Sequence, residues 1–133
     1  MKSLLLMLSV MTLLWTSCAS GIYKEDNVEQ LPPAEYLDRL SQAPDALIID
    51  VRTGMEYRKN HIDKAVNASY LSFAFGKKME GFARNQPVFI YCETAHRSPY
   101  AAKKLHKMGF ERIIDLKGGH KALRRYQTSS ARF

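Results

Sequence analysis

The chain has 133 residues, which is enough for one domain and too few for two ordinary ones. Its formal net charge is +7, but the lysines and arginines are scattered, and no run alternates basic with aromatic residues as a nucleic-acid groove would. We therefore expect no nucleic-acid partner and a general attraction for small anions. No cluster of cysteine and histidine has the spacing of metal ligands, so we expect no metal.

The first residues have the pattern of an export signal. Lys2 supplies a positive charge, an apolar run follows over residues 4–15, and small residues lead to Cys18. The run is too short for a spanning helix, which needs about 20 residues. A cysteine directly after a small residue resembles the lipobox of bacterial lipoproteins, in which that cysteine is lipidated and becomes the new N-terminus. We therefore expect a signal peptide over residues 1–17 and a tether over 18–30, with simple secretion as the alternative.

This leader also defines the environment of the two cysteines, Cys18 and Cys92. Lipidation of Cys18 would place the protein in the periplasm or cell envelope, anchored to a membrane, with Cys92 as its remaining thiol. An odd cysteine in an exported protein indicates either intermolecular pairing or a reactive thiol.

Helical and strand patterns alternate along the rest of the chain. We expect one domain over residues 31–127 and a loose tail over 128–133. Predicted helices begin at Leu31, at Thr53 (a capping box with Glu56), at Phe73 and at Ser98, and the last helix runs from Gly118-Gly119 to about Tyr126. Predicted strands cover residues 46–51, 65–68, 87–91 and 111–116. A further edge strand is possible at residues 21–24. Alternation of this kind predicts a mostly parallel sheet with helices on both faces.

The most informative stretch joins the strand over 87–91 to the helix that begins near Ser98. Cys92 stands at the carboxyl end of the strand, the edge at which open α/β sheets bind ligands. Ser98 suits an N-cap and Pro99 the first helical position. The positive end of a helix dipole and the nearby backbone N–H groups favour a thiolate at Cys92. Arg97 can fold back over the loop and pair with an anion bidentately.

The length of this loop separates two chemistries. Four residues stand between Cys92 and Arg97, whereas protein tyrosine phosphatases place five between their cysteine and arginine. A loop that is one residue shorter suits a single sulfur atom better than a tetrahedral phosphate. A phosphatase-like enzyme is therefore the weaker alternative.

Several motifs together resemble those of the rhodanese family of sulfurtransferases. The matching pieces, in chain order, are Asp50-Val51-Arg52 with Glu56-Tyr57, Asn60-His61-Ile62 with Ala65-Val66-Asn67, Tyr91-Cys92 with Arg97-Ser98, and Gly109-Phe110 with Gly118-Gly119. The resemblance implies a three-layer α/β/α domain with a central, mostly parallel, five-stranded sheet.

The resemblance also implies an enzyme that works without a cofactor. Cys92 would take sulfane sulfur from a small anionic donor such as thiosulfate and pass it, as a persulfide, to cyanide or a thiol. The residues expected to bind substrate are Glu93, Thr94, Ala95, His96, Arg97 and Arg52. For Arg52 a structural ion pair with Asp50 is an equal alternative, and for His96 an exposed position without a role is favoured.

Two residues of the loop depart from the family pattern. Ala95 stands where many family loops have glycine, and Glu93 would repel thiosulfate and disfavour the thiolate if its carboxylate pointed inward. The alternative function is therefore a persulfide-carrying or redox-responsive binding module with little turnover, in which Glu93 selects a protein thiol. We expect His61 to be a hydrogen-bonded structural residue, and His106 and His120 to have no partner.

Overall fold

The computed structural model describes residues 25–132; the leader, Cys18 and the possible strand at 21–24 lie outside this part. Five parallel strands form one sheet in the order β1-β5-β4-β2-β3. The strands are β1 (Val28–Leu31), β2 (Leu47–Asp50), β3 (Val66–Asn67), β4 (Val88–Tyr91) and β5 (Ile113–Leu116). The helices are α1 (Pro33–Ser41), α2 (Gly54–Lys59), α3 (Phe75–Glu80), α4 (Ser98–Lys107) and α5 (Gly119–Ser130).

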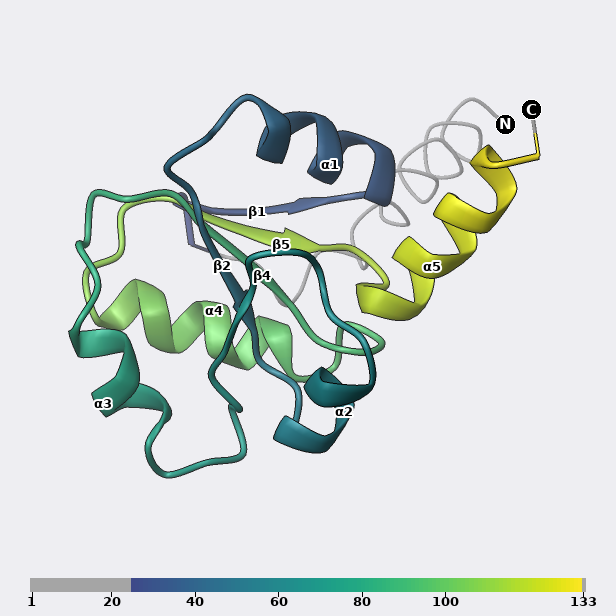
Figure 1. Ribbon diagram of the computed structural model, residues 1–133. Coiled ribbons are helices and arrows are strands. Elements are labelled where there is room, and N and C mark those ends of the chain that lie inside the picture. Colours follow the sequence, from purple (N-terminus) through teal and green to yellow (C-terminus); the bar gives the residue numbers. More distant parts are fainter. Residues whose placement is uncertain (1–24, 133) are drawn as a thin grey trace, which may run out of the picture.

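The sheet is the middle of three layers, as predicted (Figure 1). Because successive strand residues point to opposite faces, Ile49 and Ile90 pack with α3 and α4, whereas Ile48 and Phe89 pack with α1 and α5. Both β2 and β4 are fully buried, which is typical of central strands covered on two sides. The predicted α/β fold with a five-stranded parallel sheet is confirmed.

Several expected boundaries differ in the structure. The first helix begins at Pro33 and not at Leu31, because Leu31 is the last residue of a strand. The edge strand β1 begins at Val28, inside the expected tether, and pairs with β5 from Val28 opposite Ile113. The two middle residues of β1, Glu29 and Gln30, are polar, so the sequence of this strand gives only a weak strand signal. Backbone pairing with β5 holds the strand in place. At the other end, α5 continues to Ser130 instead of ending near Tyr126, and so includes part of the expected tail. This last turn is exposed and polar, so it carries no apolar periodicity.

Side-chain hydroxyls in this last turn of α5 bond to backbone carbonyls of the preceding turn. The hydroxyl of Thr128 donates to the carbonyl oxygen of Arg124, and that of Ser129 to the carbonyl oxygen of Tyr126.

In the part of the chain that the structure describes, no helix has the length and apolar character needed to cross a bilayer.

Candidate active site

Cys92 follows β4 directly and is completely buried, with its thiol free. Its sulfur lies 3.6 Å from the hydroxyl oxygen of Ser98, at the start of α4. The expectation that Ser98 caps α4 is wrong. Arg97 already has helical backbone angles and occupies the N-cap position, so Ser98 enters the first turn and its hydroxyl faces the sulfur.

The amino end of α5 holds the beginning of the Cys92 loop. The N–H groups of His120 and Lys121 donate to the carbonyl oxygens of Cys92 and Glu93, at 2.8 and 3.0 Å. Gly119 has a φ of +67°, and a Cβ there would lie 2.6 Å from the Cys92 carbonyl oxygen. Only glycine fits this approach of two backbones.

Arg97 is held at the other end of the loop by Glu56 of α2. Two parallel hydrogen bonds of 2.7 and 2.8 Å join the guanidinium to the carboxylate. Glu56 also completes the predicted capping box, because it accepts a hydrogen bond from the N–H of Thr53. The bonds from Arg97, supported by those from Thr53, lower the pKa of Glu56 to about 2.

Arg97 also lies close to the Cys92 sulfur. The pKa of Arg97 is raised, chiefly by its hydrogen bonds to Glu56 and further by the neighbouring Cys92. Glu56 was predicted only as a helix cap. Its role as the anchor of Arg97 was missed, although its place just beyond the end of β2 was a usable signal.

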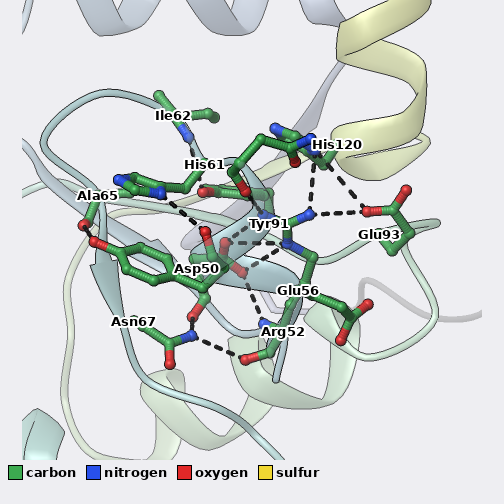
Figure 2. Close-up of polar contacts among 12 residues, drawn as sticks. Asp50, Arg52, Glu56, His61, Ile62, Ala65, Asn67, Tyr91, Glu93 and His120 are labelled. Atoms are coloured by element: carbon green, nitrogen blue, oxygen red, sulfur yellow. Dashed lines mark hydrogen bonds and ion pairs between the residues drawn. The ribbon is translucent and has the colours of Figure 1, made fainter. Parts of the chain in front are cut away.

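The side chain of Glu93 contacts two arginines, Arg52 (Figure 2) and Arg124. One carboxylate oxygen lies 2.9 Å from Nη1 of Arg52, and the other lies 2.7 Å from Nη2 of Arg124. Burial raises the pKa of Glu93, but the hydrogen bonds from Arg124 and Arg52 outweigh it, so the net pKa is lowered. Glu93 is therefore an ionised carboxylate with two cationic partners.

Arg52 lies beneath the loop, and its guanidinium is fully engaged (Figure 2). Nε and Nη2 donate to Asp50 at 3.0 and 2.7 Å, Nη2 also donates to the Asn60 carbonyl, and Nη1 donates to Glu93. The structural ion pair with Asp50 is confirmed. Direct binding of substrate by Arg52 does not fit this arrangement, because the side chain is only 1% exposed and has no free donor face.

The expectation that His120 has no partner is wrong. Its Nδ1 lies 3.2 Å from Nη1 of Arg52 and 2.5 Å from Nη1 of Arg124. Because arginine only donates, Nδ1 must accept, and the proton of the neutral ring is on Nε2. Burial, followed by the charges of Arg52 and Arg124, lowers the pKa of His120 to about 4.

Two further histidines have partners. His106 also contradicts the expectation, since its ring lies 2.6 Å from the Asn27 side-chain oxygen and 3.2 Å from Glu25. The structural role predicted for His61 is confirmed, because its Nδ1 lies 2.9 Å from the carbonyl oxygen of Tyr57 and its ring stacks on that of Tyr57.

The middle of the loop, residues 94–96, lies at the surface of the protein. Thr94 and His96 are exposed, and their side chains lie 2.8 Å apart at Oγ1 and Nδ1. Between them Ala95 has a φ of +61°, in the left-handed region that favours glycine. Alanine at this position, where many family loops have glycine, therefore strains the backbone. Within residues 25–132, no group of three or more histidine, cysteine and acidic side chains is placed to hold a metal ion.

Comparison with known proteins agrees with this geometry. The model of the rhodanese-like domain matches residues 33–125, and the chain belongs to that family. The uncharacterised protein YqhL of Bacillus subtilis (strain 168) is 35% identical over 103 residues, which cover 77% of this chain and 78% of that protein. A protein of Allochromatium vinosum named sulfurtransferase is 27% identical over 92 residues, which cover 69% of this chain and 84% of that protein.

Solved structures are similar in fold. A rhodanese-related protein from Thermoplasma volcanium superposes with a TM-score of 0.64 at 19% identity, covering 74% of this chain and 92% of that one. At this identity the likeness concerns the fold alone. The resemblance to the rhodanese family inferred from the motifs is confirmed.

Proposed function

We propose that the protein is a sulfurtransferase in which Cys92 carries the transferred sulfur as a persulfide. The observation that carries this proposal is the site itself: a free thiol at the end of β4, against the amino end of α4, with Arg97 held beside it by Glu56. Membership of the rhodanese-like family and the sulfurtransferase name of one relative support it.

The reaction consists of two displacements at sulfur. The Cys92 thiolate attacks the outer sulfur of the donor, a new S–S bond forms, and the rest of the donor leaves with the electron pair of the broken bond. A thiolate or cyanide then attacks the outer sulfur of the persulfide, and Cys92 leaves as a thiolate. The hydroxyl of Ser98, 3.6 Å from the sulfur, can donate to the thiolate in both steps.

We propose thiosulfate as a donor that this site accepts. Arg97 lies beside the sulfur, and its guanidinium, although paired with Glu56, has further N–H groups that can donate to the anionic end of the donor. The negative charge of Glu93, which would oppose thiosulfate, is countered by Arg52 and Arg124. Backbone N–H groups of residues 93–97 can stabilise the persulfide anion at the helix start.

The test is transfer of sulfur from thiosulfate to cyanide by the purified chain, measured as thiocyanate. We expect Cys92→Ser to abolish turnover and Cys18→Ser, which removes the other cysteine, to retain it. Turnover that survives in Cys92→Ser would refute the mechanism. A gain of one sulfur atom at Cys92 without thiocyanate would indicate a persulfide carrier instead, and hydrolysis of an aryl phosphate that depends on Cys92 would indicate a phosphatase-like enzyme.

We propose in addition that the protein is exported and held at a membrane of the cell envelope through lipid on Cys18. The support is the charged, apolar and small-residue pattern of residues 1–18. Mass spectrometry of the native N-terminus tests this proposal. A lipidated Cys18 is the expected terminus, and an unmodified chain that begins elsewhere would refute it.

A further inference from the structure

Arg124 connects the middle of α5 with the active-site loop. Its Nη2 lies 2.7 Å from one oxygen of Glu93, and its Nη1 lies 3.5 Å from the other oxygen and 2.5 Å from Nδ1 of His120. The Arg124 side chain is 43% exposed, whereas that of Arg52, the other cation on Glu93, is 1% exposed. Arg124 can therefore be replaced without leaving a cavity in the core.

The charges around Glu93 show why Arg124 matters. Arg52 is already paired with Asp50 through three side-chain hydrogen bonds, so its positive charge is largely cancelled there. His120 is neutral at pH 7, because its pKa is about 4. The two carboxylates of this cluster are balanced by two guanidiniums only while Arg124 is present. Without it, one net negative charge would stand on the residue that directly follows Cys92.

We propose that Arg124 is a positioning residue that sets the preference of the Cys92 thiol for anionic electrophiles, by holding and neutralising the Glu93 carboxylate. For sulfur donors this inference rests on the proposed function, since it concerns which donor reaches the thiolate. The same field acts on any electrophile that approaches Cys92, and it can therefore be measured without sulfur transfer.

The experiment compares two alkylating reagents on the full chain, one anionic (iodoacetate) and one neutral (iodoacetamide), with modification of Cys92 followed by peptide mass spectrometry. In Arg124→Gln we expect the ratio of the iodoacetate rate to the iodoacetamide rate to fall about tenfold, because an uncompensated negative charge on the residue next to Cys92 repels the anionic reagent and not the neutral one. Arg124→Lys, which keeps the charge, should give an intermediate ratio. The matched control is Arg125→Gln, which removes the same charge from the exposed neighbour on α5 and should change the ratio less than about twofold.

Rescue distinguishes charge from structure. In Glu93→Gln/Arg124→Gln the carboxylate and its cation are both gone, so the cluster has the same net charge as the wild type and the ratio should return to the wild-type value. Equal ratios in Arg124→Gln and Arg125→Gln, or no recovery in the double variant, would overturn the proposal. The two proposals can fail separately. If the wild-type chain makes no thiocyanate and gains no sulfur, the proposed function is refuted. If the variants nevertheless show the expected changes in the reagent ratio, the role of Arg124 is supported.

Discussion

Two arginine–glutamate contacts hold the two ends of the Cys92 loop, and they differ mainly in burial. At the start of the loop Glu93 binds Arg52, whose side chain is 1% exposed; at its end Arg97, 23% exposed, binds Glu56, 30% exposed. A buried charge that loses its partner is strongly destabilising, whereas a partly exposed one is screened by water. We therefore expect the first contact to matter mainly for stability and the second mainly for the proposed reaction.

The largest effect is expected from Arg52→Gln. This change leaves the buried carboxylate of Asp50 without its cation and Glu93 with Arg124 alone. We expect the free energy of unfolding to fall by about 3–5 kcal/mol, measured by urea denaturation.

The comparison at the other end of the loop is Arg97→Gln. It should cost about 1 kcal/mol of stability or less, because Arg97 and Glu56 both remain accessible to water. Its kcat/KM for an anionic sulfur donor should nevertheless fall at least about tenfold, since a bidentate cation is lost beside the sulfur. Equal losses of stability in Arg52→Gln and Arg97→Gln would contradict the distinction between the buried and the exposed contact.

A smaller effect is expected from pH, through His120. Its pKa in the folded chain is about 4, below the ordinary value of 6.5, so the unfolded chain takes up the proton first as the pH falls. The folded ring faces Arg52 and Arg124, with Glu93 at 3.9 Å and the Tyr91 ring stacked on it. Stability is therefore full above about pH 6.5 and lost towards pH 4, by about 2 kcal/mol between pH 7 and pH 5.

Variants of two histidines test this assignment. His120→Gln, which can still accept hydrogen bonds but does not titrate, should remove most of this pH dependence from urea titrations at the two pH values. His106→Gln, on α4, should keep it. A slope that is unchanged in His120→Gln would show that other groups cause it.

The smallest effect is expected in the middle of the loop, at Ala95. Ala95→Gly relieves a left-handed backbone and should raise the free energy of unfolding by about 1 kcal/mol. Lys64→Gly, at a φ of +62° away from this loop, is the matched control and should stabilise the chain by a similar amount. Only Ala95→Gly should change the rate at which Cys92 is alkylated; equal rates in both variants would show that the strain at Ala95 does not affect the sulfur.

The sequence was sufficient for features that depend on neighbouring residues. The apolar run of β2, the capping box of Thr53 and Glu56, and the strand, cysteine and helix around Cys92 all carry local signals, and the structure places them as predicted. The regular alternation of elements was enough for the parallel sheet, because the connections leave few alternatives.

The contacts that make the site were less predictable, since they join distant parts of the chain. Glu93 meets Arg124 across 31 positions, Arg97 meets Glu56 across 41, and Arg52 meets His120 across 68. Nothing in the residues next to Glu93 indicates whether its carboxylate will face the sulfur or an arginine. The direction of this one side chain is set by two arginines that stand far from it in the sequence, Arg52 and Arg124.

The close approach of Gly119 to Cys92 has a consequence for biosynthesis. The N–H groups that hold the Cys92 and Glu93 carbonyls belong to residues 120 and 121, so they leave the ribosome after every strand has been made. A nascent chain that ends before α5 has its cysteine but lacks these donors, and we expect its thiol to react with little preference for anions. Alkylation of chains stalled before and after Gly119 measures this difference. Formation of α5 thus completes the loop around Cys92 after the five strands of the sheet have been made.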